Sequence, residues 1–192
     1  LLIAEHDNKE LNPATLNTMT AAKEIGGDVT LLVAGENCGA VAEAAAKIDG
    51  VTKVLKADHA ALAHQLAEPM AQLIADQAKA GGYKYILAPA TTTGKNIMPR
   101  AAALLDTQQI SDILAVESAD TFRRPIYAGN AVATVQSKQD INIITVRATG
   151  FDKAAAEGGS AAVEDVSFDG ARDLSSFVGQ TLTESERPEL TS

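Results

Sequence analysis

A glycine-lysine pair, Gly94-Lys95, follows the apolar run YKYILAPA and precedes a helix-like pattern of apolar residues. A strand, a Gly-Lys loop and a helix are the order found in phosphate-binding loops, where backbone N–H groups face the phosphates. The motif G-x-x-x-x-G-K-[ST] is broken here, because Pro89 replaces its first glycine and Asn96 its last residue. The stretch is therefore not a Walker loop, although an anion could still bind from Thr91 to Lys95 at a helix N-terminus.

The simpler interpretation of this loop is structural, with Thr93 capping the helix and Lys95 in solvent. The other cations that stand out are Arg100, Arg123 and Arg124. They could contact phosphate, but we expect salt bridges to a neighbouring domain or subunit instead.

Histidine and cysteine give little support for chemistry. The chain has three histidines, His6, His59 and His64, and the last two are spaced so that they do not align on one helical face. A metal site is therefore not expected. Cys38 lies at a predicted helix start, where a thiolate could be stabilised, but no partner base is evident and we expect a structural role. Nucleophile elbows, G-x-G-x-x-G motifs and paired carboxylates are also missing. The sequence predicts no catalytic residue, no cofactor-binding residue and no metal ligand.

Composition limits the protein classes further. The 192 residues are 46% hydrophobic and 4% aromatic with no Trp, which suits a sheet covered by helices with small side chains. A net charge of -9 argues against nucleic acid and anionic membranes as partners. One cysteine excludes a disulfide framework and any cysteine-based metal or iron–sulfur site within the chain. No apolar run approaches the roughly 18 residues of a membrane span. The sequence starts at Leu1 without Met, so a targeting peptide cannot be judged.

Strand and helix patterns alternate through the first two thirds. Apolar runs predict strands over 1–6, 28–35, 51–58, 83–90 and 111–118. Helical stripes lie between them, with ends marked by Asn12-Pro13, Gly26-Gly27, Gly50, Pro69 and Gly81-Gly82. The predicted inward residues include Leu16, Met19, Ala22, Val41, Ala44, Ala45, Ile48, Met70, Leu73, Ile74, Ala78, Ile97, Ala101, Leu104 and Leu105. We expect Pro99 near the start of its helix. The alternation predicts an α/β fold, a mainly parallel sheet with helices on both faces.

The pattern changes after residue 120. The runs PIYAGNAVATVQS (125–137) and INIITVRA (141–148) are separated by KQD, which predicts an antiparallel hairpin as a β extension near the C-terminal end. The segment 160–169 could add one strand. From 171 to 192 the chain is polar and acidic, which is typical of a linker or exposed arm. The expected organisation is an α/β domain over 1–170 followed by a connector over 171–192.

Three stretches together carry a resemblance: TTTGKNIMPRAAALLDTQQISDILAVESADTFRRPIYAGNAVATV, GFDKAAAEGGSA and the closing SERPELTS. Their order and spacing resemble the N-terminal domain of electron transfer flavoprotein α subunits, over essentially the whole chain. The resemblance implies an adenine nucleotide alpha hydrolase-like, or Rossmann-like, fold. It also implies that Gly94, Lys95, Asn96, Pro99 and Arg100 form a structural signature at a domain or subunit contact.

The resemblance implies an electron carrier subunit rather than an enzyme. Such complexes accept electrons from acyl-CoA and other flavin dehydrogenases, in fatty-acid and amino-acid oxidation, and pass them to the respiratory chain. The implied partners are the β subunit, those dehydrogenases and the electron transfer flavoprotein–ubiquinone oxidoreductase. FAD is expected in the full heterodimer, held chiefly by a second α domain beyond Ser192, and AMP in the β subunit. The implied location is the cytoplasm of a bacterium or the mitochondrial matrix of a eukaryote.

Two other functions stay open from the residues. A stand-alone nucleotide-binding α/β module for AMP or ATP would use the loop from Thr91 to Lys95, although Pro89 and Asn96 disfavour it. A small-molecule hydrolase or transferase is the weakest alternative, since no nucleophile and base are evident.

Overall fold

Residues 1–170 and 174–181 are described by a computed structural model. A seven-stranded sheet runs through the centre in the order β10-β3-β2-β1-β4-β9-β5, and every ladder in it is parallel. Its strands are β1 (Leu2–Ile3), β2 (Val29–Gly35), β3 (Val51–Asp58), β4 (Tyr85–Pro89), β5 (Gln109–Ile113), β9 (Asn142–Val146) and β10 (Ala162–Asp165). The predicted α/β class and mainly parallel sheet are confirmed.

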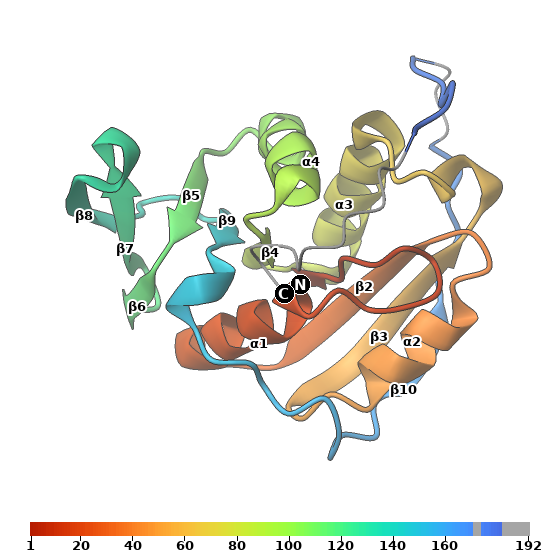
Figure 1. The fold of residues 1–192 in the computed structure, drawn as a ribbon, viewed down its shortest axis with the longest axis horizontal. Helices are drawn as coiled ribbons and strands as arrows, with labels where there is room; N and C mark the ends of the chain where they lie inside the picture. The colour runs from red at the N-terminus through yellow and green to blue at the C-terminus, as the bar shows by residue number, and fades with distance from the viewer. Residues whose placement is uncertain (171–173, 182–192) are drawn as a thin grey trace.

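Helices cover both faces of this sheet (Figure 1). They are α1 (Ala14–Ile25) and α2 (Gly39–Ala46) on one face, and α3 (Ala67–Gly81) and α4 (Thr92–Leu104) on the other. Strand β2 shows why two cores form, because alternate side chains of a strand point to opposite faces. Leu31 and Val33 pack with α1 and α2, whereas Leu32 and Ala34 pack with α3 and α4.

The helix boundaries follow most of the predicted signals. Asn12 accepts a hydrogen bond from the Ala14 N–H at 2.9 Å, and α1 ends at Gly26 with φ 94°. Two predicted inward residues are wrong, since Ala44 and Leu104 are exposed. The buried stripes of these two helices run through Ala42 in α2 and Met98 in α4 instead.

Pro99 lies in the interior of α4, not near its start. The helix begins early because Thr91, not Thr93, is its cap: the Thr91 Oγ1 accepts a hydrogen bond from the Gly94 N–H at 3.2 Å. The predicted cap was wrong by two residues, and the prediction that Pro99 lies near the helix start was wrong because it is the eighth residue of α4.

The predicted strand 111–118 is two strands in different sheets. It divides into the end of β5 and β6 (Ala115–Ser118). Asp112 has φ 63°, and the register between β5 and β9 shifts beside it. This left-handed residue interrupts the extended backbone, and the chain leaves the large sheet after Ile113, which still pairs with Val146 of β9.

The predicted hairpin of 125–137 with 141–148 is also wrong. The antiparallel extension consists of β6, β7 (Thr121–Ile126) and β8 (Ala131–Gln136), joined in the order β6-β7-β8. Strand β9 instead enters the large sheet between β4 and β5. All five β9 residues are buried, which is the environment of a parallel strand covered on both faces.

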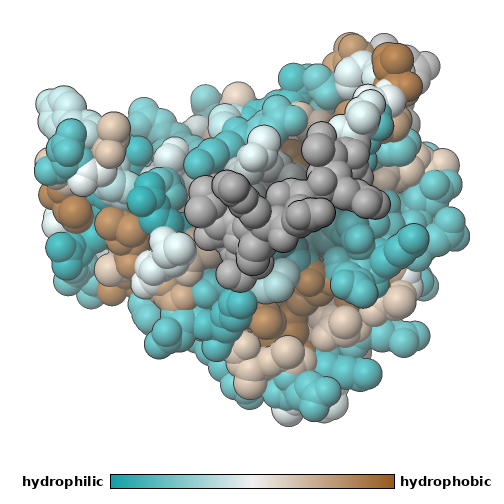
Figure 2. Space-filling view, viewed as in Figure 1, coloured by the Kyte–Doolittle hydropathy of each residue, from teal (hydrophilic) through white to brown (hydrophobic). Residues whose placement is uncertain are grey.

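The small sheet projects beside β5 at one end of the molecule (Figure 1). Apolar surface gathers there, where Val132 is exposed, and on the segment 174–181, where Leu174 and Val178 are exposed (Figure 2). Within the described residues, three 3-10 turns complete the secondary structure: η1 (Ala60–Leu62), η2 (Tyr127–Gly129) and η3 (Ala148–Gly150). The strand predicted within 160–169 is confirmed as β10.

The predicted connector 171–192 lies partly outside the described residues, which omit 171–173 and 182–192. Its described part is exposed along its length and contacts the domain through Ser175 and Phe177. Ser175 donates a hydrogen bond to the Glu68 carboxylate at 2.7 Å, and the Phe177 ring stacks on His64 with centroids 3.7 Å apart.

Candidate functional site

The loop singled out for phosphate binding joins β4 to α4 at the carboxyl end of the parallel sheet. This edge is where open α/β sheets bind ligands. Thr91 caps α4 through its side chain, and its carbonyl oxygen accepts a hydrogen bond from the Lys95 N–H at 2.9 Å. The chain itself therefore satisfies part of the first turn that a phosphate would use.

A carboxylate also lies at this helix start. Glu5 accepts hydrogen bonds from the Thr91 hydroxyl at 2.5 Å and from the Asn12 side-chain amide at 3.1 Å. Burial raises the pKa of Glu5, and these two hydrogen bonds oppose that rise. Glu5 thus places a carboxylate beside the N-terminus of α4, which disfavours a second anion there, and it ties the end of β1 to α4.

Gly94 is explained by packing. A Cβ at this position would lie 1.9 Å from the carbonyl oxygen of Pro89, so any larger residue would push α4 away from β4. The glycine allows close approach of helix and strand, and no phosphate is needed to account for it.

A pocket of about 290 Å³ opens next to this loop, which we call the switch-point pocket. It is lined by residues from the loops after β1, β4 and β9, with contributions from α1, α4 and β5: Asn12, Pro13, Ala14, Asn17, Ala90, Thr91, Lys95, Asp112, Arg147, Ala148, Thr149 and Lys153. Three of these residues carry positive charge and one carries a carboxylate.

Arg147 and Asp112 form the fixed wall of this pocket. The Arg147 Nε donates to the Asp112 Oδ1 at 3.1 Å, and its Nη2 bonds the other carboxylate oxygen, a two-point contact. Asp112 is held in its left-handed conformation by a hydrogen bond from its N–H to the Thr145 hydroxyl at 2.9 Å. Lys95 and Lys153, both exposed, form no ion pair with the described residues.

Sequence reasoning did not single out Arg147, Asp112 or Lys153. The sequence feature that could have indicated this pocket is Arg147, a charged residue directly after the apolar run INIITV. It was obscured because that run was assigned to a hairpin rather than to a parallel strand, whose carboxyl end would mark a site.

The three histidines lie in separate structural settings. His6 is buried, accepts a hydrogen bond from the Asn8 N–H at 3.0 Å and contacts Gln65, and burial lowers its pKa to about 4. His59 accepts a hydrogen bond from the Ala61 N–H at 3.1 Å, and His64 stacks on Phe177. Across 1–170 and 174–181, no cluster of three His, Cys, Asp or Glu side chains could hold a metal ion.

Cys38 precedes the first residue of α2, as predicted for a helix start, but it is fully buried. Burial raises the pKa of its thiol, and the negative charge of Asp58 adds to the effect. The thiolate is disfavoured, so this environment does not support a nucleophile.

The cations take different roles. Arg124 donates from its Nε to the Ser111 carbonyl at 2.8 Å, and Arg123 lies 3.8 Å from Glu117. These two side chains therefore have partners inside the chain. Arg100 and Asn96 lie exposed on α4.

Comparison with known proteins identifies relatives. The sequence profile of the electron transfer flavoprotein domain matches residues 1–171. Proteins named electron transfer flavoprotein subunit alpha from Pseudomonas aeruginosa and Paracoccus denitrificans are 63% and 51% identical, with all of this chain and 61% of each relative covered. A Dictyostelium discoideum protein of that name, labelled mitochondrial, is 45% identical over all of this chain and 58% of its own length. The chain thus spans about three fifths of these relatives.

Proposed function

Because the chain belongs to the electron transfer flavoprotein domain family, we propose that it is the first domain of an α subunit and acts as a scaffold for the complex. The family match over 1–171 and the 63% identity across the whole chain carry this proposal. Relatives with this name are flavoproteins that transfer electrons, so the proposed role is that of a carrier subunit, not an enzyme.

The proposed division of labour is that this domain provides orientation and partner surface, and a flavin held elsewhere in the complex provides the redox chemistry. The chain has a single cysteine, which is buried, and no Trp, so it offers no dithiol and no indole for electron transfer. A bound FAD supplies the one-electron chemistry that side chains lack. At the start of α4 the Glu5 carboxylate and the Gly94 contact do not fit a flavin pyrophosphate.

The proposed organisation has an α/β domain over 1–170 and a connector over 171–192 that leads to the FAD-binding domain. The proposed partners are a β subunit carrying AMP, flavin-dependent dehydrogenases such as those acting on acyl-CoA, and the electron transfer flavoprotein–ubiquinone oxidoreductase. The designation "subunit alpha" of the relatives supports a partner subunit.

We expect the complex to work in the cytoplasm of bacteria or the matrix of mitochondria, in line with the organisms and labels of the relatives. In the part of the chain that the structure describes, no helix has the length and apolar character to cross a membrane.

The test of this assignment is the flavin content of two purified proteins, the 192-residue chain and the full-length α subunit with its β subunit. After denaturation, the complex should release FAD in stoichiometric amount, and the 192-residue chain should release neither flavin nor adenine nucleotide. Stoichiometric FAD from the short chain would refute the scaffold role. Stoichiometric adenine nucleotide alone would favour the stand-alone nucleotide module.

A further inference from the structure

The proposed scaffold role does not explain the location of the switch-point pocket. From β1 the chain proceeds to β2 and β3 on one side, and β4, β9 and β5 lie on the other. Strand order therefore reverses between β1 and β4, and the pocket lies at the carboxyl ends of strands on this line. Crevices at such points are where open α/β sheets bind ligands, because loops from neighbouring strands diverge there.

Its charge is opposite to that of the chain. Lys95, Arg147 and Lys153 line the pocket with Asp112 as the one carboxylate, whereas the whole chain carries -9. Arg147 is neutralised by Asp112, but its side chain stays 41% exposed. The two lysines have no ionic partner among the described residues, so the pocket presents two unbalanced positive charges.

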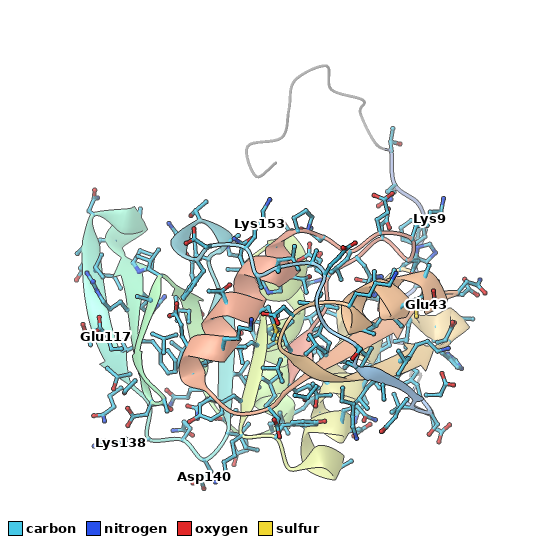
Figure 3. All side chains as sticks on the ribbon, turned by 90° about the horizontal axis from the view of Figure 1, so that it is seen from below. Lys9, Glu43, Glu117, Lys138, Asp140 and Lys153 are labelled. Atoms are coloured by element: carbon cyan, nitrogen blue, oxygen red, sulfur yellow. The ribbon has the colours of Figure 1, made fainter. Side chains whose placement is uncertain are left out.

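The backbone around these lysines is fixed. Lys95 lies in the first turns of α4, which Thr91 caps. Lys153 lies beside α1 (Figure 3), on a loop held to that helix at two points. The Asn17 side-chain amide donates to the Phe151 carbonyl at 2.6 Å, and the Ala154 N–H donates to the Leu16 carbonyl at 3.1 Å. The backbone that carries both lysines is thus fixed by packed elements.

The start of α1 adds to this field. This 12-residue helix begins at Ala14, a residue of the pocket wall, and its N-terminus carries partial positive charge. The Ala14 N–H already donates to Asn12, so the helix contributes through its dipole and not through that N–H. The amides of Asn12 and Asn17 already donate to Glu5 and to the Phe151 carbonyl. The second N–H of each amide and the Thr149 hydroxyl are able to hydrogen-bond an oxyanion.

We propose that the switch-point pocket binds a small, doubly charged oxyanion, namely a phosphate group, between Lys95 and Lys153. Two unbalanced lysines match the charge of a phosphate dianion. A volume of about 290 Å³ leaves room for a small organic group attached to the phosphate. The pocket wall includes Thr91 and Lys95 at the start of α4, and the Thr91 hydroxyl already donates a hydrogen bond to Glu5.

The test is calorimetric titration of inorganic phosphate into the full-length α/β complex at low ionic strength. Wild type is compared with Lys95→Gln, Lys153→Gln and the double variant. Binding that these variants lose is assigned to this pocket, and binding that they retain is assigned to other anion sites in the complex. The control is Lys138→Gln, an exposed lysine at the opposite edge of the molecule (Figure 3). We expect at least about tenfold weaker binding in each pocket variant and a change of less than about twofold in the control.

Equal binding in wild type and the double variant would overturn the proposal, as would the lack of a saturable, lysine-dependent component up to about 10 mM phosphate. Succinate serves as the carboxylate probe. Stronger lysine-dependent binding of succinate than of phosphate would overturn the phosphate assignment. Assembly with the β subunit is measured on the same variants: retained assembly with lost phosphate binding supports a ligand site and leaves the scaffold role intact. Parallel loss of both would assign the lysines to the subunit contact and overturn the phosphate site.

Discussion

Gly94 lies in the first turn of α4, against the end of β4. The backbone of Pro89 leaves no room for a methyl group in place of the glycine hydrogen. Gly94→Ala should destabilise the chain by about 1–3 kcal/mol, because the clash is with the backbone oxygen of Pro89 and not with a movable side chain. Gly39, in the first turn of α2, is the matched control, since a Cβ there meets nothing within 4 Å.

Gly39→Ala should leave stability unchanged or raise it by about 0.5–1 kcal/mol, as expected for alanine in a helix. Urea unfolding of the two variants measures the difference. Equal stability of the two alanine variants would show that α4 tolerates a shift away from β4.

His6 should make stability depend on pH. Burial lowers its folded-state pKa to about 4 from an ordinary value of 6.5. The unfolded chain therefore binds more protons between these values, and stability is full above pH 6.5 and falls as the pH drops towards 4. The loss attributed to His6 is about 3 kcal/mol.

His6→Gln should remove most of the decrease in the free energy of unfolding between pH 6.5 and 4, measured by urea unfolding at several pH values. His64→Gln, at an exposed position, should retain that decrease. An NMR titration that gives His6 a pKa near 6.5 in the folded chain would contradict this account.

Residue types were only partly informative about the site. The broken motif at Pro89 and Asn96 argues against a Walker loop, because both departures affect groups that a phosphate needs. The Glu5 contact could not be predicted, since it joins residues 86 positions apart through tertiary packing.

At the scale of elements, α4 depends on one side chain for its start. Thr91 caps the helix and also holds Glu5, so Thr91→Ala should cost about 1–2 kcal/mol. Thr91→Ser keeps the hydroxyl and should restore most of that stability. Thermal unfolding of both variants provides the measurement, and a serine variant as unstable as the alanine variant would show that the lost methyl packing, not the cap, matters.

Most elements of the α/β sheet could be predicted from apolar runs and helix-ending residues, because local signals determine them. The wrong prediction of a hairpin between 125–137 and 141–148 concerned which strands pair, and strand pairing depends on residues far apart in the sequence. Burial separates the two strands: β8 alternates between partly buried and exposed residues, whereas all five residues of β9 are buried, including the polar Asn142 and Thr145. Alternation suits a two-sided antiparallel strand, and continuous burial suits a parallel one.

The break between β5 and β6 could not be predicted from its residues. The run ILAV contains no glycine or proline, and the change of sheet depends on the positive φ of Asp112 and its contact with Arg147. Both are consequences of tertiary structure.

At the scale of the whole molecule, the proposed scaffold role requires an exposed surface that contacts the β subunit. Arg100 is exposed on α4 within the signature GKNIMPR. Arg100→Ala should lower the affinity of the α subunit for the β subunit by roughly tenfold, with little effect on folding. Lys47→Ala, at the end of α2 on the opposite face of the sheet, is the matched control. Affinity for an immobilised β subunit is the measurement, and unchanged affinity of the Arg100 variant would place the contact elsewhere.

The most direct test of the scaffold role is sedimentation velocity of the 192-residue chain mixed with separately expressed β subunit, without added flavin. The account predicts a one-to-one complex, because the partner surface would belong to this domain and not to the flavin. Two separately sedimenting species, at concentrations where the full-length α subunit forms its heterodimer, would contradict it.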